Sequence, residues 1–309
     1  MTFVDPSTGP VIHATKLPAR QPADLLHVKP DSEGVVAADP ARAGWRYLSF
    51  RAFELGDGEV TILDDPDRET AIVTIGGGGI DLEFLGRHPR FRLTGRASVF
   101  EGMPWSAYLP AGVAARIVGR PLPRRRAVVA IAQAPRSGRA GVATSPILVT
   151  PADVGIEIRG SGNATRQVNN IMLGDFPADR LLICEVFTPA GNWSGWPPHK
   201  HDVDDMPREA VLEETYFYQF SRPEGWAIQR LYHRDGSRDL FWAVRSGELV
   251  LVDQGYHPFA ATQGYDAYYL NALAGDRRTM AASDDPDLAW VRGTWPGMVK
   301  DPRLPLVQP

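Results

Sequence analysis

The stretch LVLVDQGYHPFAATQGYDAYYLNALAG, residues 249–275, carries the pattern that decides the fold. It starts and ends with apolar and aromatic runs, LVLV and YYLNALA, and the segment between them is interrupted by Gly and Pro. Short runs of this composition, bounded by turn-forming residues, are typical of β-strands joined by turns. The stretch therefore predicts two or more neighbouring strands.

The same alternation of β-rich runs and turns continues along the whole chain. Its 309 residues include 30 Gly and 27 Pro, spread without a low-complexity block. Other β-rich runs are EVTILDD, TAIVTI, RAVVAIA, PILVTP, RLLICEVFTP, ETYFYQF and WAIQRLYH. Helical patterns are scarce, and MPREAVLEE (206–214) is a candidate for one or two helical turns. The chain is therefore predicted to be all-β, built of barrels or sandwiches rather than βαβ units.

A weak internal echo suggests two related β domains. The segment TGRASVFEGMPWSAYLPAG (94–112) resembles SGELVLVDQGYHPFAATQG (246–264) in its order of glycine turn, β run and aromatic–proline segment. A length of 309 residues also suits two domains of about 150 residues each. We place the boundary within 136–154 and predict domains over 1–145 and 146–309.

The net charge and hydropathy of the chain argue against nucleic acid and membranes as partners. The net charge of −4 gives no electrostatic reason to expect nucleic acid or an anionic membrane. No stretch approaches the 18 apolar residues of a membrane-spanning helix, and the N-terminal MTFVDPSTGP lacks a signal-peptide pattern. These features favour a cytoplasmic protein. The sequence does not fix the oligomeric state, and a homo-oligomer is compatible with it.

Histidines with metal-ligand spacing occur only in the second half. In GWPPHKHDVDD (195–205), His199 and His201 are two residues apart, so on a strand both side chains face the same way. Further ligands are available from Glu213 or Glu214 and from His257. Imidazole suits zinc, manganese, iron, nickel or copper. The first half holds only isolated histidines: His13, His27 and His88.

Several ordered blocks resemble the 5-deoxy-glucuronate isomerases of inositol catabolism, a cupin family related to the uronate ketol-isomerases. The resemblance is strongest over residues 155–292, and in the first half MPWSAYLPAG fits the degenerate first cupin domain of that family. The blocks are RGSGNATRQVNNIM (159–172), GNWSGWPPHKHD (191–202), LEETYFYQF (212–220), AIQRLYHRDG (227–236), residues 249–275 and DDPDLAW (284–290). The resemblance implies a two-cupin (bicupin) fold of β-barrel or jelly-roll domains, with no metal ligands in the first domain.

The family pattern, carried over residue by residue, implies one metal site in the second domain, with ligands His199, His201, Glu214 and His257. Glu214 is preferred by analogy with related uronate ketol-isomerases, in which the ligand glutamate directly precedes a similar aromatic strand. An ordinary cupin places this glutamate about four residues after the second histidine, whereas Glu214 follows His201 by thirteen. The family carries a similar insertion, and Glu213 remains an alternative.

The implied reaction converts 5-deoxy-D-glucuronate, a small uronic acid, to 5-dehydro-2-deoxy-D-gluconate. It needs one divalent metal ion, with zinc favoured over manganese or iron, and no organic cofactor. We predict catalytic roles for Arg230, Tyr218 and Tyr269 and substrate contacts for Arg166 and Asn271. Either arginine is suited to bind the substrate carboxylate. The sequence identifies neither the general base nor the choice between enediol proton transfer and hydride shift. The alternatives are a cupin dioxygenase and a non-catalytic sugar-binding cupin.

Overall fold

The structure is a computed structural model that describes residues 22–309, so the predictions on the N-terminal stretch and on His13 fall outside it. Strands dominate the described residues, and the helices are two four-residue α-helices and three short 3₁₀ helices. The all-β prediction is confirmed. The helical elements are α1 (Ala23–Leu26), α2 (Pro40–Ala43), η1 (Pro151–Asp153), η2 (Gly162–Ala164) and η3 (Ala289–Thr294).

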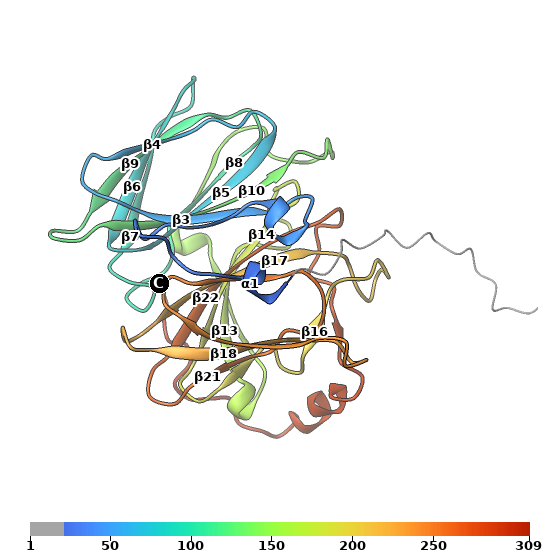
Figure 1. Ribbon diagram of the computed structural model, residues 1–309. Coiled ribbons are helices and arrows are strands. Elements are labelled where there is room, and N and C mark those ends of the chain that lie inside the picture. Colours follow the sequence, from blue (N-terminus) through green and yellow to red (C-terminus); the bar gives the residue numbers. More distant parts are fainter. Residues whose placement is uncertain (1–21) are drawn as a thin grey trace, which may run out of the picture.

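The first half forms two facing sheets, drawn in blue to green in the upper part of Figure 1. One sheet has the order β11-β8-β5-β10-β3-β2 and the other the order β4-β9-β6-β7. Aliphatic side chains such as Ile72, Leu82 and Ile117 fill the space between them. The strands are β2 (Val36–Ala38), β3 (Ser49–Leu55), β4 (Val60–Leu63), β5 (Arg68–Gly76), β6 (Gly78–Phe84), β7 (Phe91–Arg96), β8 (Ser106–Leu109), β9 (Ala115–Pro121), β10 (Ala127–Pro135) and β11 (Ile147–Val149).

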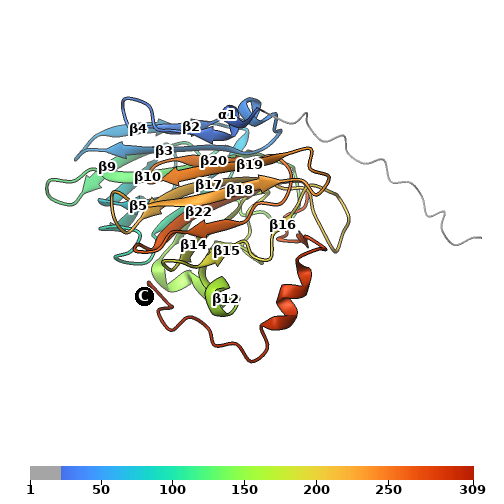
Figure 2. The same ribbon diagram turned by 60° about the horizontal axis from the view of Figure 1, so that its bottom comes forward.

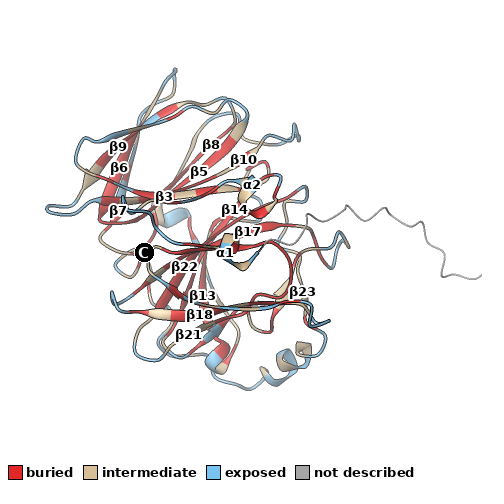
Figure 3. Ribbon diagram, viewed as in Figure 1, coloured by how far each residue is buried: buried red, intermediate tan, exposed pale blue. Residues whose placement is uncertain are grey.

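The second half repeats this arrangement with larger sheets. Its main sheet has the order β1-β20-β17-β22-β14-β13-β12, and it is accompanied by the sheet β15-β21-β18-β19 and the pair β16-β23. Figure 3 shows that the strands at the centre of both halves are largely buried. The strands are β1 (His27–Val28), β12 (Gly155–Arg159), β13 (Arg166–Met172), β14 (Leu182–Thr188), β15 (Trp193–Ser194), β16 (His199–Lys200), β17 (Glu213–Phe220), β18 (Trp226–Tyr232), β19 (Asp239–Arg245), β20 (Leu249–Val252), β21 (Phe259–Ala261), β22 (Ala267–Ala274) and β23 (Ser283–Asp284).

The helix considered for residues 206–214 does not form. This segment is a turn closed by a bridge between Asp205 and Glu209, and β17 begins at Glu213. The Glu209 carboxylate accepts hydrogen bonds from the backbone N–H groups of Asp202 and Val203 and from Lys200. These contacts hold the insertion as a looped-out turn, which overrides its helical pattern.

Two glutamates, one in each half, accept hydrogen bonds from backbone N–H groups of the other half. Glu69, near the start of β5, accepts the backbone N–H groups of residues 179–181 at 2.6–2.7 Å. Glu213, at the start of β17, accepts those of residues 46–48 at 2.6–2.9 Å. In addition, β1 pairs with β20, which brings the start of the described chain into the sheet of the second half. The division at residue 145 stays a prediction.

Helices long and apolar enough to span a membrane do not occur within residues 22–309.

Candidate metal centre

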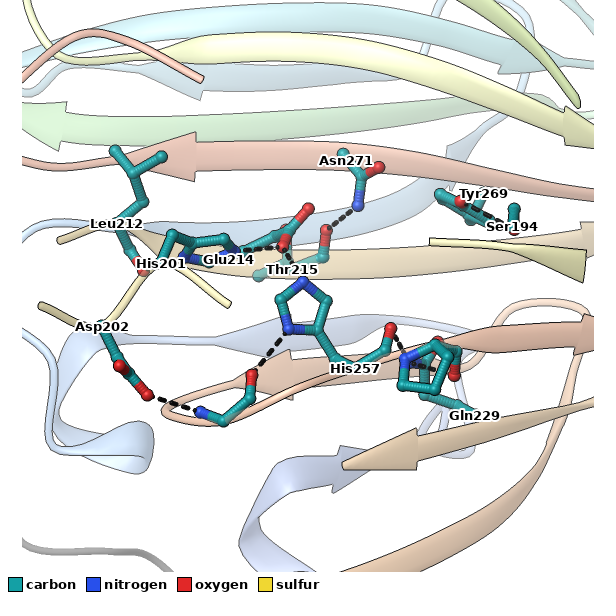
Figure 4. A network of polar contacts seen from close by, with 12 residues as sticks. Ser194, His201, Asp202, Leu212, Glu214, Thr215, Gln229, His257, Tyr269 and Asn271 are labelled. Carbon is teal, nitrogen blue, oxygen red and sulfur yellow. Dashed lines mark hydrogen bonds and ion pairs between the residues drawn. The ribbon is translucent and has the colours of Figure 1, made fainter. Parts of the chain in front are cut away.

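Three buried side chains from three different segments converge inside the second half. His201 follows β16, Glu214 is the second residue of β17, and His257 lies between β20 and β21. One ligand atom from each lies within 4.8 Å of the others. Figure 4 shows both imidazole rings directed at the Glu214 carboxylate. This is the arrangement that a metal-binding group requires.

The two imidazoles are oriented by backbone carbonyl groups. Nδ1 of His201 donates to the carbonyl oxygen of Leu212 at 2.9 Å, and Nδ1 of His257 donates to that of Gly255 at 2.9 Å. Each ring therefore turns its Nε2 towards Glu214, at 2.8 Å for His201 and 3.2 Å for His257. Such an outer contact at Nδ1 is the usual way in which a protein orients a metal-binding histidine.

The donor set fits a divalent metal ion. His257 is 1% exposed, and its Nε2 lies 3.2 Å from the Glu214 carboxylate without a well-aligned hydrogen bond to any described residue. A buried ring nitrogen whose hydrogen-bonding capacity is poorly used is costly unless it binds something. Together with a second imidazole and a carboxylate, it forms a nitrogen and oxygen ligand set that suits zinc, manganese or iron.

The charges of the group are strongly linked. Burial opposes ionisation of Glu214, but hydrogen bonds and charge from His201 and His257 outweigh it and lower the pKa of Glu214 to about 2. Burial likewise disfavours a charged His201, yet the contact with Glu214 prevails and raises the pKa of His201. The carboxylate is thus held in the ionised form that a metal ion needs.

His199 lies beside this group. Its ring centroid is 4.8 Å from that of His257 and 6.5 Å from that of His201. Burial, followed by the neighbouring His257, lowers the pKa of His199 well below its ordinary value. The ring is therefore neutral, which is the form that binds metals.

Glu213 and Glu214 have separate tasks. The Glu213 carboxylate accepts hydrogen bonds from the three backbone N–H groups of residues 46–48. The Glu214 carboxylate instead contacts His201 and His257. Adjacent residues on a strand point to opposite faces, so the two carboxylates cannot exchange places without a shift in register. Of the two, only the Glu214 carboxylate therefore lies beside His201 and His257.

The predicted tyrosines and asparagine are buried near the centre but are engaged with other groups. Tyr218 donates to Oε1 of Gln229 at 2.9 Å, and Tyr269 donates to Oγ of Ser194 at 2.9 Å. Asn271 donates to the carbonyl oxygen of Thr215 at 3.2 Å. These contacts hold the strands of the interior in register around the metal-binding group.

The two predicted arginines lie in different places. Arg230 forms a paired contact with the Asp239 carboxylate, at 2.8 and 3.0 Å, on a partly exposed surface. Its neighbour Gln229 faces the interior, so Arg230 projects from the opposite face of β18. Arg166 is only 9% exposed and lines a cavity together with His199 and Glu214.

This cavity, of about 210 Å³, opens beside the histidines. Three further charged lining residues, Arg159, Asp284 and Arg292, were not predicted, because Arg159 lies more than 100 residues before the other two. Arg159 belongs to the block 159–172 and Asp284 to the block DDPDLAW (284–290), and the pairing of β23 with β16 brings Asp284 to the cavity. The lining residues are Arg159, Arg166, His199, His201, Leu212, Glu214, Leu273, Met280, Ala282, Asp284 and Arg292.

Fold and site together define a two-cupin protein with a buried His–Glu–His group in its second half. The chain belongs to the KduI/IolB family, whose model matches residues 25–291.

Similar sequences and a similar crystal structure support this family assignment. The chain is 41% identical to a 5-deoxy-glucuronate isomerase of Geobacillus kaustophilus, over 85% of this chain and 92% of that protein. A similar isomerase of Geobacillus thermodenitrificans is 40% identical, over 85% and 93%. The crystal structure of an IolB-like protein from Salmonella typhimurium has 35% identity and a TM-score of 0.79, covering 86% of this chain and 99% of that one.

A more distant structure establishes the fold alone. The oxalate decarboxylase of Lactobacillus farciminis is 10% identical, with a TM-score of 0.57, and covers 84% of this chain and 88% of that one. The predicted bicupin fold is thereby confirmed.

Proposed function

We propose that this protein is a metal-dependent aldose–ketose isomerase that converts 5-deoxy-D-glucuronate to 5-dehydro-2-deoxy-D-gluconate in inositol catabolism. The observation that carries the proposal is the buried His201–Glu214–His257 group, of which His201 and Glu214 line a cavity that also holds a buried, positively charged Arg166. The names of the relatives supply the substrate. We further propose a cytoplasmic location.

The ligand set proposed here consists of His199, His201, Glu214 and His257, with zinc as the ion. A bound divalent ion would polarise the aldehyde carbonyl and stabilise the negative charge that develops on its oxygen. The protein contributes the imidazoles, an ionised carboxylate at Glu214 and a cavity of about 210 Å³ that restricts water around the reacting carbons.

Arg166 is proposed to bind the carboxylate at the far end of the substrate. Its Nη1 contacts only the carbonyl oxygens of Ala164 and Trp196, both at 3.3 Å, and no acidic residue of the described chain pairs with it. Burial lowers the pKa of Arg166 to about 10, so the side chain stays positively charged at neutral pH. A buried cation without a counter-charge is unfavourable, and a substrate carboxylate would provide that charge.

The Arg166→Ala variant is therefore expected to lose about 100-fold in kcat/KM, mostly through KM, since a buried charge-assisted contact is worth roughly 2–5 kcal/mol. Steady-state kinetics with 5-deoxy-glucuronate measures this loss. Arg234→Ala, which removes a surface arginine paired with Asp287, is the matched control. A large loss in Arg230→Ala with none in Arg166→Ala would assign the carboxylate to the other arginine.

The function itself is tested by incubating the zinc-loaded protein with 5-deoxy-glucuronate and following the aldehyde signal by NMR. Conversion to the ketose is expected, and it should stop on chelation and return when metal is added. An absence of conversion refutes the isomerase. Oxygen consumption by the iron-loaded protein would instead indicate the dioxygenase.

A further inference from the structure

The isomerisation proposed above needs a group that moves a proton between two adjacent carbons, and the cavity offers few. Among the described residues that line it, the only carboxylates are those of Glu214 and Asp284, and the lining includes no Tyr, Cys, Ser or Lys. Glu214 is engaged with His201 and His257. This leaves Asp284 as the carboxylate that faces the cavity without a task in the metal-binding group.

Strand pairing places Asp284 next to a predicted metal ligand. In the β16–β23 pair, Asp284 is directly opposite His199. Directly opposite residues of an antiparallel pair project to the same face, with Cβ atoms about 4.5–5.5 Å apart. Both side chains line the cavity, so the carboxylate faces the same space as His199, His201 and Glu214.

The backbone around Asp284 is firmly held. The next residue, Asp285, donates its backbone N–H to the carbonyl oxygen of Pro198 at 2.8 Å and accepts the Tyr232 hydroxyl on its carboxylate. Figure 2 shows the red C-terminal segment that follows, with η3 below β16. The backbone of residues 284 and 285 is thus held against the segment that carries His199.

Arg292, in η3, fixes the orientation of the carboxylate. Its Nη2 donates to Oδ1 of Asp284 at 2.8 Å, and its Nε donates to Oδ2. A carboxylate oxygen has two lone pairs, so each oxygen keeps one for a substrate. The ion pair also neutralises Arg292, which leaves Arg166 as the cavity arginine without an acidic partner.

We propose that Asp284 is the catalytic base and acid of the isomerisation. Its carboxylate takes the proton from C2 of the open-chain aldose, and the C–H electron pair forms the C1–C2 double bond of an enediol while the C1 carbonyl oxygen takes a proton from water. The carboxylic acid then returns a proton to C1 as the C2 hydroxyl gives its own proton to water and becomes the ketone. C1 and its oxygen each gain one hydrogen, C2 and its oxygen each lose one, and nothing external is oxidised or reduced.

The test combines Asp284→Asn with isotopic labelling. The variant is expected to lose at least about 100-fold in kcat, because a positioned acid–base group contributes roughly 10²–10⁴-fold. Zinc content per chain and calorimetric affinity for D-gluconate, a sugar acid without a carbonyl group, should stay within about threefold of the original protein. Asp284→Glu should recover part of the lost turnover, because it restores the carboxylate.

The original protein should also introduce solvent deuterium at the former aldehyde carbon, C1 in the numbering of the aldose, when it turns over in D₂O. The side chain of Asp284 is 18% exposed, so its transferred proton exchanges with water. This measurement stands even if the asparagine variant does not fold. Complete transfer of a C2 label to C1 without exchange would overturn the proposal, as would an asparagine variant that keeps more than about a tenth of kcat.

Asp287→Asn is the control, since Asp287 pairs with Arg234 at the exposed surface three residues further on. The proposal depends on the isomerase function, and the two fail in different ways. If the unaltered protein converts no substrate, the function is wrong. If it converts substrate and Asp284→Asn does so equally well, only the role of Asp284 is wrong.

Discussion

A Glu214→Gln protein is expected to lose the metal ion and nearly all turnover. The substitution replaces a buried anionic oxygen, 2.8 Å from His201 and 3.2 Å from His257, by a neutral amide of the same shape. Loss of an outer contact to a metal ligand already costs about 10–100-fold in affinity, so loss of the charged ligand itself should exceed about 100-fold. Calorimetric zinc titration and metal content per chain measure the affinity, and the NMR assay measures turnover.

Glu213→Gln is the matched control, because it is the same substitution one residue earlier. It should retain zinc at one ion per chain. Its free energy of unfolding should fall by about 2–3 kcal/mol, since three backbone N–H groups lose their charged acceptor. Denaturant unfolding gives this difference. If Glu213→Gln loses zinc and Glu214→Gln keeps it, the two glutamates have been assigned the wrong way round.

This pair also shows what the sequence could and could not predict. The spacing of His199 and His201 predicted a common face, because side chains alternate along a strand; in the structure β16 ends at Lys200, and His201 directly follows it. The same rule states that only one of Glu213 and Glu214 can join them. It does not say which, because β17 is buried along almost its whole length and has no polar face to mark the outside.

The two arginines illustrate a second limit. Arg166 and Arg230 both lie in strands with turn-flanked β patterns, and no local signal distinguishes the buried one from the surface one. The difference arises from tertiary contacts. Arg230 forms an ion pair with Asp239 on the neighbouring strand β19, whereas no acidic residue of the described chain pairs with Arg166. Asp284 likewise enters the cavity only because β23 returns to pair with β16.

The reciprocal glutamates are a second similarity between the two halves, outside the segments 94–112 and 246–264. Glu69 and Glu213 each occupy the start of a central strand and bind backbone N–H groups of the other half. The residue that follows is Thr70 in the first half and Glu214 in the second. With a threonine at the matching position and an aliphatic interior, the described part of the first half has no equivalent of the metal-binding group.

A Glu185→Gln protein is expected to be less stable by about 3–5 kcal/mol, because it leaves a buried arginine without its counter-charge. Arg96 in β7 and Glu185 in β14 are joined by two hydrogen bonds, at 2.7 and 3.1 Å, and their side chains are 1% and 0% exposed. Asn169 donates a further hydrogen bond to the same carboxylate at 2.9 Å. The pair connects a sheet of the first half with the main sheet of the second.

Urea unfolding followed by fluorescence measures the loss, with Glu59→Gln as the control. Glu59 pairs with Arg126 at the surface, and its removal should cost far less stability, because exposed ion pairs contribute little. Replacing both partners together, as Arg96→Met with Glu185→Leu, should recover most of the stability, because a buried ion pair seldom stabilises more than an apolar pair of similar volume. If the double variant is less stable than Glu185→Gln alone, the ion pair contributes net stability to the contact between the halves. If Glu185→Gln costs no more than Glu59→Gln, this contact does not depend on the pair.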